Sequence, residues 1–142
     1  MSDSFDLQRF VNAQDHVYDQ VLSELRAGAK RTHWMWYIFP QIRGLGSSPT
    51  AQFYALQSKE EAIAYDQHDV LGPRLRECTE LVLQIEDRTI KEIFYFPDHM
   101  KFRSCMTLFD HVLEESDLFR QALDKYFDGE LDRRTLSILA EE

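Results

Sequence analysis

The chain has 142 residues, of which 44% are hydrophobic, 13% aromatic and 29% charged; this suits one domain, residues 1–142, and excludes a disordered chain. The net charge of -9 argues against general binding to nucleic-acid polymers, because an acidic field repels the phosphate backbone. The longest apolar run, residues 34–39, is too short for a bilayer span, and no signal-peptide pattern is visible, so we expect a cytoplasmic protein without a membrane partner.

Apolar residues recur at intervals of three and four from residue 6 to residue 27. This spacing predicts one long helix, or two consecutive helices with a break near Asp15, ended by Gly28. Residues 34–39 are apolar or aromatic at every position, so both faces of this segment should be covered by other parts of the chain.

Helix-start signals follow this segment. Ser48 before Pro49 predicts an N-cap, and residues 58–61, Ser-Lys-Glu-Glu, form a capping-box pattern, so two short helices are expected. A helical stripe then continues from about residue 69 to residue 86, whereas residues 90–96 are ambiguous between a short helix and a strand.

The C-terminal third reads as three further helices. The first begins at Pro97 with Asp98 near its cap, the second is capped by Ser116 and ended by Gly129, and the last is capped by Asp132. Strand alternation, hairpin signals and repeats are absent from the sequence. We therefore predict an all-α fold, a single compact domain of about six to eight helices.

Cysteines and histidines give no sign of a metal site. Cys78 and Cys105 lie within apolar helical patterns, which favours buried thiols over a disulfide. The five histidines are scattered and the HExxH motif is absent, so we expect neither a metal nor another cofactor.

Charge is distributed unevenly along the chain. Residues 25–59 contain no Asp or Glu and five Lys or Arg, which leaves -14 for the rest of the chain. A local positive surface on an acidic body suits a small anionic ligand better than a polymer.

Two tryptophans and a histidine stand inside this basic region. Met35, Ile38 and Phe39 are expected in the core, whereas Trp34 and Trp36 belong either to the core or to a ligand site, because a buried indole N–H needs a polar partner. His33 is either satisfied by a backbone carbonyl at a helix start, capped by Thr32, or lies beside a ligand as a proton carrier.

The loop that follows has the composition of an anion cradle. Two glycines allow close approach to a ligand, a helix start offers free N–H groups, and arginine donates two hydrogen bonds to phosphate. An ordinary loop between helices is the alternative, and the spacing fits neither a Walker A nor a dinucleotide-binding motif. The candidate ligand-binding residues are Gln41, Arg43, Gly44, Gly46, Ser47 and Ser48.

A second polar group occupies one side of the predicted helix after Pro97. Asp98, Lys101 and Ser104 recur at intervals of three, and Thr107 and Arg103 flank them. They would complete an anion site or assist proton transfer, unless this side is only a solvated helix face. The sequence leaves open whether segments 33–48 and 98–107 meet.

Four segments resemble a bacterial family of uncharacterised domains that is often labelled "calpastatin". They are HWMWYIFPQIRGLG, VLGPRLRECTELVL, DHMKFRSCMTLF and FRQALDKYFDGELDRRTLSIL, and the likeness extends from Phe5 to Leu139. The label itself does not fit, because a calpain inhibitor of that type is a disordered repeat protein.

The family pattern matches this chain at many polar and aromatic positions and departs from it at Cys105, where serine is expected. The order of features is also similar to the NADAR domains, all-α proteins linked to cleavage of N-glycosidic bonds in ribosyl compounds, at the level of layout alone. The matching positions are His33, Trp34, Trp36, Pro40, Gln41, Gly44, Gly46, Asp98, Lys101, Ser104, Thr107, Asp132 and Thr135.

Three hypotheses follow. The first is a pocket for a nucleotide or ribosyl phosphate, with His33, Lys101 and Ser104 positioning or moving protons, and with Asp98 or Asp132 stabilising an oxocarbenium charge if the protein is an N-glycosidic hydrolase. The second is a protein-interaction module anchored by exposed aromatic residues. The third is a structural or regulatory domain, and the sequence does not decide whether the protein is an enzyme.

Overall fold

The first helical pattern forms two helices rather than one. In the computed structural model, which describes residues 5–142, α1 spans Gln8–Asp15 and α2 spans Tyr18–Ala27. Val17, between them, leaves the helical conformation with φ -130° and ψ -2°, which places the break close to the predicted position. Gly28 ends α2 in the left-handed region, with φ 76°, as its sequence position predicts.

Short helices surround the aromatic segment. The next three are α3 (Met35–Ile38), a single turn, α4 (Pro49–Tyr54) and α5 (Lys59–Gln67). Ser48 caps α4 as predicted, because its side chain accepts a hydrogen bond from the N–H of Ala51 at 3.1 Å.

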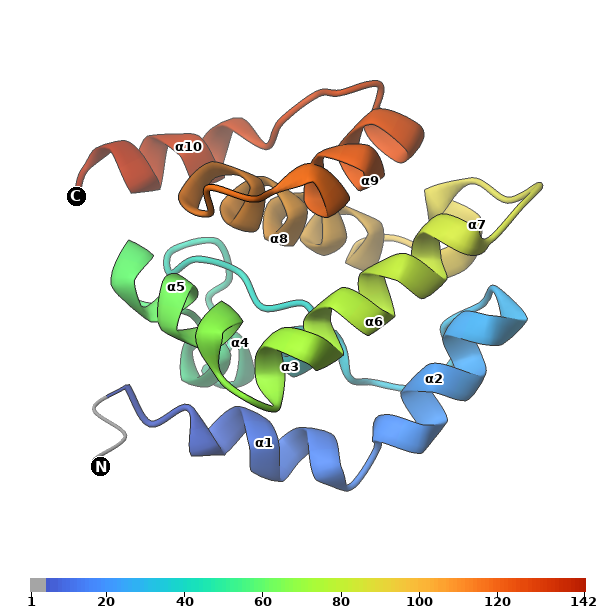
Figure 1. Ribbon diagram of the computed structural model, residues 1–142, viewed down its shortest axis with the longest axis horizontal. Helices are drawn as coiled ribbons and strands as arrows, with labels where there is room; N and C mark the ends of the chain where they lie inside the picture. The colour runs from blue at the N-terminus through green and yellow to red at the C-terminus, as the bar shows by residue number, and fades with distance from the viewer. Residues whose placement is uncertain (1–4) are drawn as a thin grey trace.

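The last five helices lie between residues 71 and 140, and those drawn in orange and red lie opposite the blue helix α1 (Figure 1). The five are α6 (Leu71–Gln84), α7 (Ile90–Phe94), α8 (Asp98–Val112), α9 (Asp117–Phe127) and α10 (Arg133–Ala140). Asp132 caps α10 as predicted, by accepting from the N–H of Thr135.

The ambiguous segment 90–96 is helical over its first five residues. Thr89 forms a capping box with Glu92, since its side chain accepts from the Glu92 N–H and the Glu92 carboxylate accepts from the Thr89 N–H at 2.7 Å. The Thr-x-x-Glu pattern that decides for a helix is present in the sequence.

The predicted capping box at Ser58 is only half formed. Ser58 does accept from the N–H of Glu61, but the Glu61 carboxylate accepts from the N–H of Gln57 and from Arg9 instead of the Ser58 N–H. Arginine at 3.0 Å is a stronger partner for the carboxylate than a second backbone amide, which explains the difference.

Two other predicted caps lack their side-chain hydrogen bond. Ser116 occupies the N-cap position of α9 without accepting from the helix. Thr32 does not cap the helix after His33, because α3 begins at Met35 and the Thr32 hydroxyl donates to Glu24.

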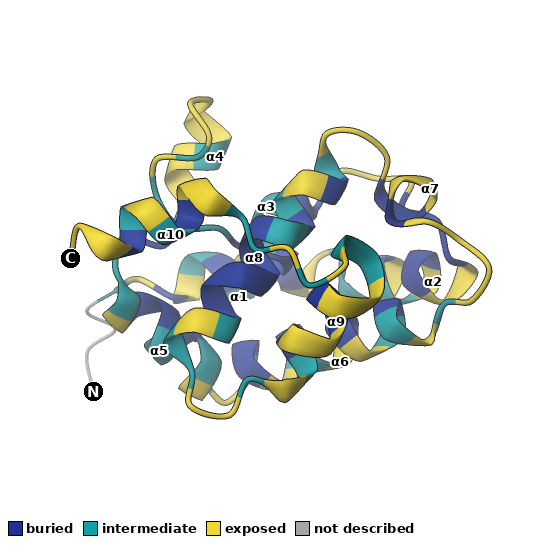
Figure 2. Ribbon diagram, turned by 90° about the horizontal axis from the view of Figure 1, so that it is seen from above, coloured by how far each residue is buried: buried dark blue, intermediate teal, exposed yellow. Residues whose placement is uncertain are grey.

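Helix α8 is the centre of the fold. It packs against α9, α5, α7, α10 and α3, and its residues are buried over most of its length (Figure 2). Phe39 meets Phe102 of α8 edge to face, with ring centroids 5.0 Å apart, which joins the aromatic segment to this helix. The core prediction for Met35, Ile38 and Phe39 is confirmed, and both cysteines are free and buried as expected.

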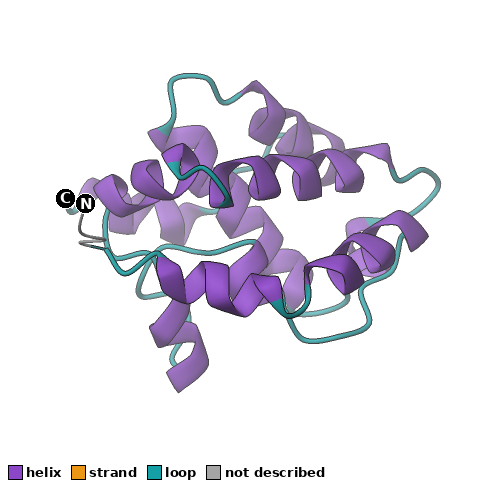
Figure 3. Cartoon of the chain, turned by 60° about the horizontal axis from the view of Figure 1, so that its bottom comes forward, coloured by secondary structure: helices purple, strands orange, loops and turns teal. Residues whose placement is uncertain are grey.

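The predicted all-α fold is confirmed. Over residues 5–142 the chain consists of ten helices joined by loops, and seven of these helices have eight or more residues (Figure 3). The described residues form no strand, and their β contact is an isolated bridge between Ile42 and Leu56. None of the helices in this part of the chain combines the length and the apolar character that crossing a membrane requires.

Candidate functional site

The two candidate segments meet at one cavity. A hollow of about 410 Å³ opens between the loop from α3 to α4, the start of α8 and the start of α10. We call it the Trp36 cavity. It is lined by Trp36, Gln41, Leu45, Gly46, Ser47, Ser48, Ala51, Pro97, Met100, Lys101, Ser104, Asp132 and Arg134.

Lys101 and Trp36 form the contact between α8 and the aromatic segment. The Lys101 Nζ atom lies 4.9 Å from the centroid of the Trp36 ring and 3.3 Å from Asp98 Oδ1. Asp98 is held in turn by Lys30, whose Nζ lies 2.9 Å from Oδ2 and whose side chain is only 7% exposed. Asp98 therefore does not line the cavity itself, and it holds Lys101 at the cavity through their ion pair.

Asp132 presents one carboxylate oxygen that has no hydrogen-bond donor among residues 5–142. Its Oδ2 accepts from the N–H of Thr135 at 3.0 Å and from the Thr135 hydroxyl, and it lies 3.2 Å from Ser104 Oγ. The backbone N–H of Asp132 donates to Thr107 Oγ1 at 2.9 Å. Thr107 is fully buried, so it positions Asp132 from the core. Oδ1 is the carboxylate oxygen that these contacts leave unoccupied.

The glycine-containing loop is closed by α10. Gly44 has φ +91°, a conformation that favours glycine, and its carbonyl oxygen accepts from Arg134 Nη2 at 3.1 Å. A Cβ atom on Gly46 would lie 2.6 Å from the Cβ of Ala51, so this position has no room for a side chain. The loop thus depends on glycine twice, once for its turn and once for its packing.

Trp34 is a core residue, the first of the two alternatives that the sequence leaves open, and it does not line the Trp36 cavity. Its side chain is 1% exposed, and its indole N–H donates to Glu24 Oε1 at 3.0 Å. Burial by itself would raise the pKa of Glu24, but hydrogen bonds from Thr32, from the N–H of Arg31 and from Gln20 outweigh it and lower the pKa to about 2. Glu24 is therefore an ionised anchor for the loop before α3.

His33 and Arg43 lie outside the Trp36 cavity. His33 is exposed, and its carbonyl oxygen accepts from the Tyr37 hydroxyl. Arg43 Nε donates to the carbonyl oxygen of Gln57 at 3.1 Å, which ties the loop to the segment before α5. Arg43 therefore has a structural partner and does not line the Trp36 cavity with the other loop residues.

Sequence reasoning missed several lining residues, of which Arg134 is the most consequential. Arg134 follows the Asp132 cap by two residues, and it supplies the cavity with a second cation beside Lys101. The pattern Asp-Arg-Arg at a helix start could have indicated a cation near the Asp132 cap. Nothing in the sequence, however, places α10 beside the loop from α3 to α4. Among residues 5–142, no group of three His, Cys, Asp or Glu side chains is arranged to hold a metal ion.

Comparisons with known proteins agree with the predicted resemblance to an uncharacterised bacterial family. Residues 4–139 match the family model described as "Protein of unknown function (DUF1810)". The structure is similar to that of the conserved hypothetical protein Rv1873 from Mycobacterium tuberculosis, with 57% sequence identity, a TM-score of 0.96, and coverage of 97% of this chain and 99% of that one. No curated protein matches the chain. The chain therefore belongs to the DUF1810 family.

Proposed function

We propose that the Trp36 cavity binds a small anionic ligand with a ring, of the nucleotide or ribosyl-phosphate type. The observation that supports this proposal is the meeting of two polar segments, far apart in the sequence, at one hollow of about 410 Å³. Pockets for small molecules combine apolar walls with a few convergent polar groups, and this volume suits such a ligand.

The lining residues of the cavity have different proposed roles in binding the ligand. Lys101 and Arg134 would bind the anionic group, because Arg134 uses one N–H for the Gly44 carbonyl and keeps others for a ligand. Trp36, half-buried at the wall, would contact the ring of the ligand. Gln41 and the Ser47 and Ser48 hydroxyls would hydrogen-bond its polar edges.

Cleavage of an N-glycosidic bond is the reaction that we propose for this arrangement. The bond between the anomeric carbon and the ring nitrogen breaks, and the nitrogen keeps the electron pair and takes a proton from water. The remaining hydroxyl of that water joins the anomeric carbon. The Asp132 carboxylate would stabilise the oxocarbenium charge in between through Oδ1, a role for which its place at the cavity favours it over Asp98.

A protein-interaction module is the second candidate, and one observation favours it. Three large apolar side chains are exposed where α7 turns into α8: Tyr95 (54%), Phe96 (75%) and Met100 (52%). Such a group is typical of interaction surfaces.

A thermal-shift screen against nucleotides, ADP-ribose, ribose phosphates and simple anions, with tryptophan emission recorded in parallel, tests the proposal. We expect one ligand class to raise Tm and to change the emission. Trp34 is buried and bonded to Glu24, so the optical change should come from Trp36 and disappear in Trp36→Phe.

Lys101→Ala should lose the thermal shift, whereas Arg43→Ala is the matched control, a cation removed from the neighbouring loop but outside the cavity. Binding that is lost in Arg43→Ala and kept in Lys101→Ala would move the site away from this cavity. If no compound of the panel changed Tm or the tryptophan emission, the proposal would be overturned and the interaction module favoured.

A further inference from the structure

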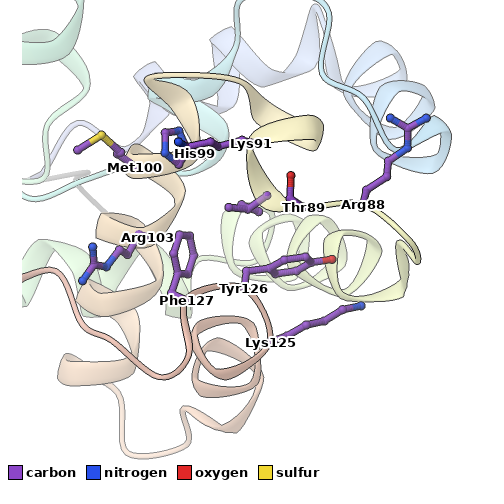
Figure 4. A pocket seen from close by; sticks show the side chains of 10 residues that line it. Arg88, Thr89, Lys91, His99, Met100, Arg103, Lys125, Tyr126 and Phe127 are labelled. Atoms are coloured by element: carbon purple, nitrogen blue, oxygen red, sulfur yellow. The ribbon is translucent and has the colours of Figure 1, made fainter.

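A second hollow, of about 530 Å³, lies between α7, α8 and the end of α9 (Figure 4). Its lining includes the cations Arg88, Lys91, Arg103 and Lys125 and no Asp or Glu. We call it the basic cleft. The chain has 25 acidic and 16 basic residues and a net charge of -9, so the charge of this lining is opposite in sign to that of the whole chain.

Two of the four cations lack a hydrogen-bond or ion-pair partner within residues 5–142. Arg88 and Lys91 are exposed, and within the described part of the chain neither side chain has a hydrogen bond or an ion pair. The nearby Glu92 carboxylate accepts a hydrogen bond from the N–H of Thr89 at 2.7 Å, and the hydrogen bonds from Thr89 lower the pKa of Glu92 more than the charge of Arg88 does. The charges of Arg88 and Lys91 therefore remain available to a ligand.

The other two cations are held in place mainly by neutral groups. Lys125 Nζ lies 2.6 and 2.9 Å from two carbonyl oxygens at the C-terminal end of α6. Arg103 donates to two carbonyl oxygens of the loop after α9, at 2.9 and 2.8 Å. Carbonyl oxygens orient a cation without cancelling its charge. Their one ion pair within residues 5–142 joins Arg103 to Glu130 at 3.6 Å, and Glu130 is 73% exposed, so this pairing is weak.

Aromatic side chains lie between these cations. Figure 4 shows the rings of Tyr126 and Phe127 between Arg103 on one side and Lys125 and Arg88 on the other. Arg103 lies 5.9 Å from the Phe127 centroid, and Lys125 lies 5.1 Å from that of Tyr126. The cleft thus offers an apolar surface flanked by positive charge, and its volume exceeds what a lone phosphate group would fill.

We propose that the basic cleft binds a small organic dianion with an aromatic body, such as an aryl phosphate. The ring packs against Tyr126 and Phe127, and the anionic group is attracted by the cations at the edges of the cleft, with Lys91 beside His99 and Arg88 at the opposite edge (Figure 4). This site is separate from the Trp36 cavity, with which it shares only the side chain of Met100.

Binding of 1-naphthyl phosphate, measured by calorimetry and by amide chemical-shift changes in the labelled protein, tests the proposal. We expect shifts concentrated at residues 88–91 and 125–127. The variant Arg88→Gln/Lys91→Gln should bind about tenfold more weakly, because two attractive charges are lost. The matched control Arg26→Gln/Arg31→Gln removes two exposed cations elsewhere and should bind like the wild type.

Three results would overturn the proposal. One is the absence of binding at millimolar probe. Another is equal binding of neutral 1-naphthol, because the cations would then contribute nothing. The third is a set of shifts at residues 44–48 and 132–134, which would place the probe in the Trp36 cavity. A failure of the nucleotide screen leaves this test unaffected, since the two readouts report on different residues.

Discussion

The ammonium group of Lys101 lies 4.9 Å from the centroid of the Trp36 ring, and this contact joins α8 to the aromatic segment at the rim of the cavity. Behind it, Asp98 lies within 3.3 Å of Lys101 and within 2.9 Å of the buried Lys30. A line of alternating charges therefore runs from the core to the candidate ligand site.

Asp98→Asn should destabilise the protein by about 2–3 kcal/mol, because it leaves the ammonium group of Lys30, 7% exposed, without its counter-charge. Lys101→Ala removes the more exposed partner of the same carboxylate and should cost less than about 1 kcal/mol. Urea unfolding of both variants measures the difference. Equal losses would show that Lys30 does not depend on Asp98.

The two tryptophans should respond differently to the same substitution. Trp34→Phe leaves a void in the core and removes the hydrogen bond to Glu24, so we expect a loss of about 1–3 kcal/mol. Trp36→Phe removes wall area and part of a cation–π contact, a loss of less than about 1 kcal/mol. Thermal unfolding distinguishes them, and a larger loss at Trp36 would contradict the assignment of Trp34 to the core.

Glu24 should make stability fall in acid. Its pKa is about 2 in the folded protein against an ordinary value of 4.5, so the unfolded chain binds a proton between these values that the folded protein does not. The contribution of Glu24 to the free energy of unfolding is complete above about pH 5 and is lost as the pH falls toward 2. Glu24→Gln should therefore be less stable than wild type at pH 7, by about 1–3 kcal/mol, and the gap should narrow in acid.

Unfolding of Glu24→Gln across pH 2 to 7 checks this expectation, with Glu60→Gln as the matched control. Glu60 is exposed in the first turn of α5 and has no hydrogen-bond or ion-pair partner among the described residues. A constant gap between wild type and Glu24→Gln over this pH range would show that the carboxylate is not held in its ionised form.

Most of the fold could be predicted because its signals are local. The break near Asp15, the end at Gly28 and the caps at Ser48 and Asp132 each depend on residues within one helical turn, and α9 ends one residue before the predicted Gly129, at the left-handed Asp128. Two of the three failed caps share a physical cause. Glu61 and Thr32 have the right side chains for capping, but Arg9 and Glu24, distant in the sequence, offer them charged partners that a local pattern does not reveal.

The candidate site was predictable in composition and not in geometry. Trp36, Gln41, Gly46, Lys101 and Ser104 were all named from the sequence, and they do line one cavity. The neighbouring Trp34 was a candidate for the same reason as Trp36. As the residue before α3, however, it has its side chain in the core. Residue types show which groups are suited to bind a ligand, whereas the path of the backbone decides which of them face the same hollow.

Asp132 combines a structural and a proposed catalytic role, and two substitutions separate them. Asp132→Ala removes the cap of α10 and the acceptor of the Thr135 N–H, so it should cost about 1–2 kcal/mol of stability. Asp132→Asn keeps an acceptor oxygen for the cap and should stay within about 1 kcal/mol of wild type. Thermal unfolding measures both.

Asp132→Asn removes the negative charge that would stabilise an oxocarbenium ion, so release of free base from AMP or ADP-ribose, followed by chromatography, should fall about 100-fold or more. Asp128→Asn is the matched control: Asp128 is exposed, lies outside the Trp36 cavity and has φ 54°, which asparagine tolerates. Equal hydrolysis by wild type and Asp132→Asn would remove Asp132 from the chemistry while leaving its cap intact. A fall in base release by Asp132→Asn together with an unchanged Tm would assign the effect to the carboxylate charge and not to the integrity of α10.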